Sequence, residues 1–256
     1  MNTIDLARPS GQAVVVGATG EVGAAIVARL RKAGVPVVAV ARDGDRLEQL
    51  SATDDGITAC PADIGDDSSG EAIAAAVSGP VRMVVQSAAV PPAGPLATIE
   101  PEVLGRSVSL KLGGLLRLIR AVDDRFVQGS RIVAIGGHFG SEPTPQTCGA
   151  GVTNAALANL IRQLADAYGP RGVTVHMIAP GVLYTDRLRR FAASHAEARG
   201  VSVETVLEEY RSHSPLGRLT TPDQIGWAVT QLLAPEADAL HGATLALDGG
   251  ARRGLF

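Results

Sequence analysis

Short apolar runs alternate with stretches of helical periodicity along almost the whole chain. The runs are rich in valine, isoleucine and alanine, a pattern typical of strands that are buried on both faces of a sheet. Between them, apolar residues recur at helical spacing, as in 21–33, where Gly34 provides a stop signal. The predicted strands are 13–16, 37–41, 57–60, 81–85, 131–135, 173–178 and 243–247, and the predicted helices are 21–33, 45–50, 71–77, 104–122, 150–168, two within 185–211, and 222–233.

Seven strands separated by helices predict an α/β fold of the Rossmann type: a doubly wound, seven-stranded parallel sheet with helices on both faces. No repeat, low-complexity tract or linker interrupts the alternation, so we expect a single domain over 1–256. A proline-rich loop at 90–95 and a charged segment at 185–215 are the two irregular excursions. Ligands of such sheets bind outside the carboxyl ends of the strands, so the residues that follow each strand carry the functional information.

The composition argues against several classes of partner. The net charge of −3 gives no basic excess for nucleic acid or anionic membranes, and aromatic residues make up only 3% of the chain, too few for platforms that stack bases. The start of the chain lacks the apolar core of a signal peptide, and no apolar run is long enough to span a membrane, so we expect a cytoplasmic protein. We expect Cys60 and Cys148 to be reduced thiols, with one disulfide as the alternative.

The first predicted strand runs directly into the sequence GATGEVG at 17–23, which opens the first predicted helix. Glycines at 17, 20 and 23 permit a tight turn and a close approach of the backbone, and the N-terminus of a helix attracts a pyrophosphate. We therefore predict a nucleotide-binding loop. The alternative is a turn that only packs the helix on the sheet.

The end of the second predicted strand bears on the choice of cofactor. An acidic residue there would bind the ribose 2′-hydroxyl of NAD. Ala41 stands in that place and Arg42 follows it, and a guanidinium suits a 2′-phosphate. We therefore expect NADP rather than NAD. The alternative is a solvated Arg42, with Asp43 turned toward the ribose.

With these motifs the chain resembles the short-chain dehydrogenase/reductase family over nearly its full length. The segment ADI at 62–64 is similar to the family's aspartate–hydrophobic pair, whose aspartate bonds the adenine amino group. The segment PGVLYT at 180–185 resembles its Pro-Gly turn, whose threonine contacts the nicotinamide carboxamide, and DGG at 248–250 resembles its C-terminal signature. The resemblance implies a cofactor site built from Gly17, Thr19, Gly20, Glu21, Val22, Arg42, Asp63, Ile64, Ser87, Ala88, Pro180, Gly181, Val182 and Thr185.

The resemblance fails at the residues that transfer protons in the family. The family's serine aligns with Gly137, and its Tyr-x-x-x-Lys pair aligns with Ala150 and Asn154. The asparagine of its long helix aligns with Ser109. Gly137 and Ala150 supply no side-chain donor, although a general acid accelerates a reaction roughly 10²–10⁴-fold. Asn154 can still bond a ribose hydroxyl, but it carries no charge, so we do not expect the family's ordinary ketoreductase mechanism.

Other side chains near the expected cleft are candidates for the chemistry. His138 follows the fifth predicted strand, and an imidazole exchanges protons near neutral pH; the alternative is a loop imidazole bonded to the backbone. Tyr184 follows the Pro-Gly turn, or else packs on the charged helices beyond it. A reactive thiol at Cys148 is a further option, and His176 is expected to be structural. We expect no metal, because metal-ligand spacing is missing at His195, His213 and His241.

Three functions stay open from the sequence alone. The first is an NADP(H)-dependent oxidoreductase with an unusual proton route, acting on a small carbonyl- or alcohol-type metabolite. The alternatives are a repurposed enzyme for non-redox isomerisation, elimination or cyclisation, and a catalytically silent nucleotide-binding subunit. We expect the charged segment 185–215 to cover the substrate. The helices 104–122 and 150–168 resemble those of four-helix dimer interfaces in the family, which implies a homodimer or homotetramer.

Overall fold

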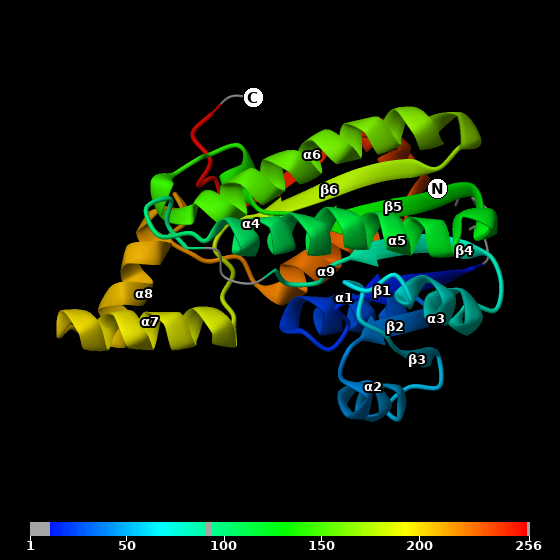
Figure 1. Ribbon diagram of the computed structural model, residues 1–256, viewed down its shortest axis with the longest axis horizontal. Helices are drawn as coiled ribbons and strands as arrows, with labels where there is room; N and C mark the ends of the chain where they lie inside the picture. The colour runs from blue at the N-terminus through cyan, green and yellow to red at the C-terminus, as the bar shows by residue number, and fades with distance from the viewer. Residues whose placement is uncertain (1–10, 91–93, 255–256) are drawn as a thin grey trace, which may run out of the picture.

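The computed structural model describes residues 11–90 and 94–254 of the chain. The seven predicted strands are present and lie in one sheet, in the order β3-β2-β1-β4-β5-β6-β7 (Figure 1). Each pairing between these strands is parallel, so the predicted fold class is confirmed. Of the predicted loop 90–95, residues 91–93 lie outside the described residues. The strands are β1 (Gln12–Val16), β2 (Val37–Ala41), β3 (Ile57–Pro61), β4 (Val81–Gln86), β5 (Phe126–Ile135), β6 (Thr174–Pro180) and β7 (Thr244–Leu247).

Helices cover both faces of the sheet, and β1 shows why its residues are apolar throughout. Val14 and Val16 belong to a core shared with α3, α5 and α6, whereas Ala13 and Val15 belong to a core shared with α1 and α9. Successive side chains of a strand point to opposite faces, so a strand in this position needs apolar residues at every place. The helices are α1 (Glu21–Lys32), α2 (Gly44–Ser51), α3 (Ser69–Ala76), α4 (Pro101–Val108), α5 (Gly114–Ala121), α6 (Cys148–Tyr168), α7 (Asp186–Arg199), α8 (Val203–Ser212) and α9 (Pro222–Gln231).

The predicted helix 104–122 is longer and interrupted in the structure. A π-helical turn at Ser109–Gly113 separates α4 from α5. The buried Gln86 side chain donates to the carbonyl of Leu110 at 3.3 Å, within this turn. Gly114 packs against the same side chain, because a Cβ there would lie 2.4 Å from Gln86 Nε2. Such turns insert one extra residue into a helix and often mark functional sites.

The charged segment forms two helices, α7 and α8, as predicted. They project from one end of the sheet (Figure 1). A small core of their own joins them, formed by Ala192, Ala196, Val206 and Leu207. The backbone amide of Asp186, the first residue of α7, donates to both carboxylate oxygens of Glu21 at 2.9 and 3.1 Å. The glycine loop therefore contacts the start of the segment expected to cover the substrate.

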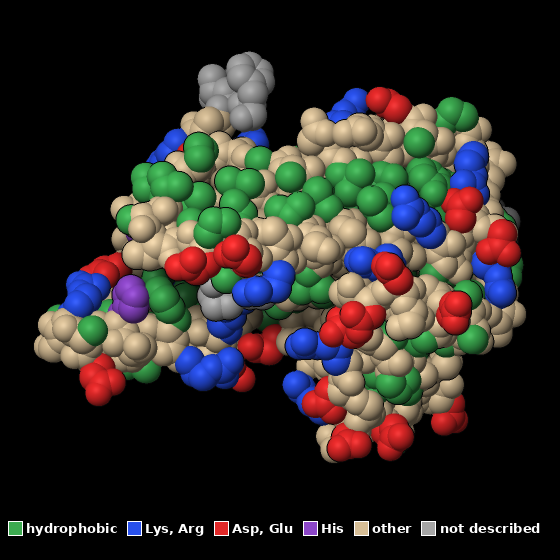
Figure 2. All heavy atoms as spheres, viewed as in Figure 1, with side chains coloured by type: hydrophobic (Ala, Val, Ile, Leu, Met, Phe, Trp, Pro, Cys, Tyr) green, Lys and Arg blue, Asp and Glu red, His purple; other side chains and the backbone are tan. Residues whose placement is uncertain are grey.

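The outer surface of the two long helical elements is apolar. Figure 2 shows a band of hydrophobic side chains that runs along α6 and the α4–α5 element. Val152 of α6 is 47% exposed, and Leu112 and Leu116 are partly exposed on the neighbouring element. This band lies on the helices expected to form a subunit interface.

Candidate functional site

The glycine loop at 17–23 forms a tight turn between β1 and α1. Gly17 has φ of +81°, and a Cβ at this position would lie 2.9 Å from the backbone of Ala88 at the end of β4. A Cβ at Gly23 would lie 2.1 Å from the Gly17 carbonyl oxygen, so both positions require glycine. Gly20 precedes α1 without a capping side chain, whereas side chains cap α2, α7, α8 and α9. α3, α4 and α6 also begin without a capping side chain, so it is the glycine loop together with the uncapped start of α1, with amides such as that of Val22, that suits an anionic ligand.

The segments after β2 and β3 lie beside this loop. Arg42 is exposed, with its guanidinium 3.9 Å from the Asp63 carboxylate. The other Asp63 oxygen accepts from the amide of Gly65 at 2.9 Å. Asp43 caps α2 by accepting from the amide of Arg46 at 3.1 Å. Asp43 is thus engaged in holding the helix, which weakens the alternative that its carboxylate serves the ribose.

Arg46 is a second cation on this side that the sequence did not single out. Its guanidinium donates to the Thr19 carbonyl at 2.7 Å, which links α2 to the glycine loop. Ile64 is buried beneath the loop after β3, at 4% exposure. Its position against α5 fits the border of a ring-binding surface.

The segments after β4 and β6 lie at the same carboxyl end of the sheet. Ser87 donates its hydroxyl to the Val16 carbonyl at 2.6 Å, which joins the ends of β4 and β1. Gly181 lies so close to Asp248 that a Cβ would be 3.0 Å from its Cα. Thr185 caps α7 through its hydroxyl, 3.3 Å from the amide of Leu188. Val182 is half-buried in the same turn, beside Pro180.

The region of the missing proton-transfer groups lies at the ends of β5 and β6. Nδ1 of His138 is 3.3 Å from the Pro180 carbonyl oxygen, to which a ring nitrogen can only donate. A Cβ on Gly137 would lie 2.8 Å from Nδ2 of Asn154 and 3.9 Å from the same Pro180 oxygen. Asn154 and His138 thus flank one strand end, from opposite sides of Gly137.

Two other candidates lie less centrally. Tyr184 is 37% exposed, and the Arg189 guanidinium of α7 lies over its ring, 5.2 Å from the centroid. Ala150 is half-buried in the first turn of α6. The free thiol of Cys148 is partly buried at the start of the same helix. Among the described residues, no disulfide joins it to the buried Cys60.

Lys111 is the site residue that sequence reasoning missed. Its ammonium donates to Oδ1 of Asn154 at 2.8 Å, and its side chain is buried. Burial lowers its pKa to about 8. Ser109, the residue aligned with the family's asparagine, is instead exposed. The one available signal was its rarity, because Lys111 is one of only two lysines in the chain and lies within the predicted helix 104–122.

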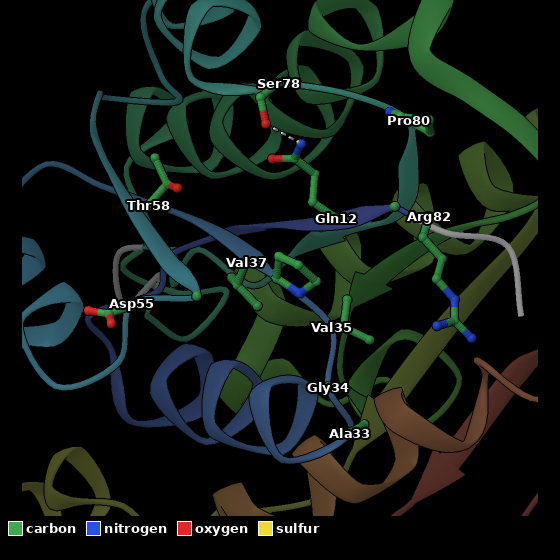
Figure 3. Close-up of a pocket in the computed structure, with 13 residues that line it drawn as sticks. Gln12, Ala33, Gly34, Val35, Val37, Asp55, Thr58, Ser78, Pro80 and Arg82 are labelled. Atoms are coloured by element: carbon green, nitrogen blue, oxygen red, sulfur yellow. Dashed lines mark hydrogen bonds between the residues drawn. The ribbon is translucent and has the colours of Figure 1, made fainter.

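A separate hollow opens at the opposite end of the sheet, where the strands begin (Figure 3). It is lined from the amino ends of four strands, β1 to β4, by residues such as Gln12, Val37, Thr58 and Arg82. Gln12 forms a hydrogen bond with Ser78 across it, at 3.1 Å. Because ligands of doubly wound sheets bind at the carboxyl ends of the strands, we assign this hollow no role.

The described residues form neither a cluster of metal ligands nor a helix that could span a membrane. Within residues 11–90 and 94–254, no group of three metal-ligating side chains lies together, and no helix is long and apolar enough to cross a membrane. His176 is buried in β6, with Nδ1 3.1 Å from the Leu240 carbonyl and Nε2 2.8 Å from the Thr174 hydroxyl. These bonds tie it into the fold.

Comparison with known proteins gives matches over most of the chain. A family model described as enoyl-(acyl carrier protein) reductase matches residues 17–252. The chain is 31% identical to the short-chain reductase protein NovJ of Streptomyces niveus, covering 93% of this chain and 92% of that protein. It is 29% identical to the inactive 2-(S)-hydroxypropyl-CoM dehydrogenase 2 of Xanthobacter autotrophicus, over 86% of this chain and 96% of that one. An NADPH-bound short-chain oxidoreductase of Pseudomonas aeruginosa PAO1, described as containing an atypical catalytic center, is 27% identical, with a TM-score of 0.84 and coverage of 95% and 97%.

Proposed function

The chain belongs to the short-chain dehydrogenase/reductase family, and from this membership we propose that it is an NADP(H)-dependent oxidoreductase with a non-standard active site. Its substrate is a small metabolite of the carbonyl or alcohol type. We further propose that the chain forms one nucleotide-binding domain and that it acts in the cytoplasm. The NADPH bound to the similar Pseudomonas aeruginosa structure supports the cofactor, and the atypical centre described there gives a precedent for the site.

The observation that carries the proposal is the cation pair beside the glycine loop. Arg42 and Arg46 lie at the end of β2 and the start of α2, and Arg46 contacts the loop itself through Thr19. Asp43, the acid that could favour NAD, is engaged as a helix cap. A phosphate on the ribose 2′-oxygen would meet positive charge here.

The rest of the cofactor fits the same cradle. The uncapped N-terminus of α1 suits the pyrophosphate. Gly17 and Gly23 carry no side chain, so the pyrophosphate can come close to the backbone of the loop. When bound, NADPH supplies the hydride that reduces a substrate carbonyl. The chain's own part is then to hold the substrate oxygen and to move a proton to it.

We assign two side chains to holding the substrate oxygen and moving a proton to it. Asn154 offers an amide donor beside Gly137, and His138 follows Gly137 with an imidazole, the side chain best suited to exchanging protons near neutral pH. We assign Tyr184 to the rim of the cleft, where its ring and Arg189 border the substrate on the side of α7. In this assignment no group stands at Ala150, where the family's tyrosine would be.

Calorimetric titration with NADPH and NADH tests the proposal. We expect NADPH to bind more tightly than NADH, and Arg42→Ala to weaken NADPH binding alone. Hydrogen bonds to charged groups contribute about 1.5–3 kcal/mol, which corresponds to roughly 10- to 100-fold in Kd. Lys32→Ala, a cation lost at the far end of α1, is the control and should change neither affinity.

Two outcomes would contradict the proposal. If neither coenzyme binds at millimolar concentration, the glycine loop has no nucleotide function. If Arg42→Ala weakens NADPH and NADH equally, the guanidinium does not recognise a 2′-phosphate.

A further inference from the structure

Lys111 is an unusual residue in this chain. The sequence contains only two lysines, Lys32 and Lys111, and the second is buried in the helical layer over the sheet. Removing an ammonium from water is expensive unless an anion compensates it. Among the described residues its one hydrogen-bond partner is the neutral amide of Asn154, and no carboxylate pairs with it. Such an arrangement weakens the fold, so a stability role does not account for it.

The π-helical turn is what brings this side chain to the site. Lys111 is the central residue of the turn Ser109–Gly113. Gln86, at the end of β4, bonds the Leu110 carbonyl and so supports the turn from the sheet. Gly114 allows the helix to approach that strand end closely. The extra residue of the turn thus places a buried lysine above the carboxyl ends of the strands.

The chemistry of the two side chains then determines which way Asn154 faces. An ammonium has three donors and no acceptor, so the atom of Asn154 that faces Lys111 must be the carbonyl oxygen Oδ1. The amide nitrogen Nδ2 consequently points the other way, to the position 2.8 Å from a Cβ on Gly137. Only a glycine at 137 leaves this position free. The amide donors therefore face the carboxyl end of β5, where doubly wound sheets bind ligands.

We propose that Lys111 is a positioning residue of the active site: it holds Asn154 so that the amide nitrogen donates, in the notch beside Gly137, to an oxygen of the bound substrate. The nature of that oxygen, a carbonyl or hydroxyl, rests on the proposed function. The orientation of the amide does not, because it follows from the Lys111–Asn154 contact alone.

The protonation of Lys111 gives this arrangement a measurable signature. Burial is the cause that lowers the pKa of Lys111 to about 8, so its charge is lost within an accessible pH range. No charged neighbour contributes to this shift among the described residues, since burial is its one cause. When Lys111 loses its proton, the hydrogen bond from its amine to Asn154 loses its charge, and the environment of the Asn154 amide changes.

Nuclear magnetic resonance of the intact protein tests the coupling without any substrate. The chain has three asparagines, Asn2, Asn154 and Asn159, so selective ¹⁵N labelling gives few side-chain amide signals. We expect the Asn154 amide shifts to titrate with a midpoint near pH 8. The exposed Asn159, which accepts from Gln163 at 2.6 Å on the outer side of α6, is the internal control and should stay constant.

Two variants separate positioning from mere packing. In Lys111→Met the Asn154 titration should disappear, and in Lys111→Arg the signals should stay at their low-pH position throughout, because the guanidinium keeps its charge. A flat Asn154 response in the wild-type protein would overturn the proposal, and this experiment needs no variant to fold.

Addition of NADPH then tests whether the amide faces the ligand cleft. At saturation we expect the Asn154 signals to move and the Asn159 signals to stay. An unmoved Asn154 amide in a protein that binds NADPH would overturn the proposal. Absence of NADPH binding would instead contradict the proposed function, while the pH titration would still decide the role of Lys111.

Discussion

At the scale of single residues, His176 shows how burial fixes a protonation state. The ring is fully buried in β6, and burial, followed by the charge of Arg131, lowers its pKa to about 4. Burial favours the neutral ring, in which Nδ1 donates to the Leu240 carbonyl and Nε2 accepts from the Thr174 hydroxyl. An unfolded histidine has a pKa near 6.5. Between pH 6.5 and 4 the unfolded chain therefore binds more protons than the folded one.

This difference predicts an acid-sensitive stability. The contribution of His176 should be fully present above about pH 6.5 and should decline, by on the order of 3 kcal/mol, as the pH falls to about 4. Urea unfolding of the wild-type protein and His176→Gln at pH 7 and pH 4.5 measures it. The variant should lose less stability between the two pH values, and an identical loss would contradict the assignment.

At the scale of elements, the contact between Glu21 and α7 joins two functional segments. The carboxylate accepts from the first amide of α7, at the positive end of the helix. We expect Glu21→Ala to loosen α7 and α8, with amide hydrogen exchange there about 10-fold faster, because a charge-assisted bond is lost. Glu197→Ala, an exposed acid of α7, is the matched control. Equal exchange in both variants would show that the contact does not hold the helix.

Among the elements, the sequence predicts the strands and the glycine loop but not the π-helical turn. The strands and the glycine loop were predictable because their patterns are local: apolar runs, turn glycines and a helix start. The π-helical turn was not, since the apolar spacing continues through 104–122 and the cause of the break is a contact with Gln86 from another strand. The position of Lys111 follows from that break. The pair Lys111–Asn154 spans 43 positions of sequence, so only the fold brings it together.

At the scale of the whole molecule, the apolar band along α6 and the α4–α5 element predicts self-association. We expect light scattering at micromolar concentration to give two or four times the chain mass of 26.2 kDa. Val152→Glu should reduce the mass, because a charge in the band cannot be buried. Phe191→Glu, on the equally exposed α7 surface, should not. A wild-type protein that stays monomeric would contradict the prediction.

The separate core of α7 and α8 bears on how proteins of this kind diverge. Ala192, Ala196, Val206 and Leu207 belong to neither of the two cores that hold the sheet. Inherited substitutions among them alter how the two helices pack on each other and leave the β-sheet packing untouched. Under the proposed function, lineages can therefore change the helices beside the substrate without disturbing the sheet that carries the glycine loop.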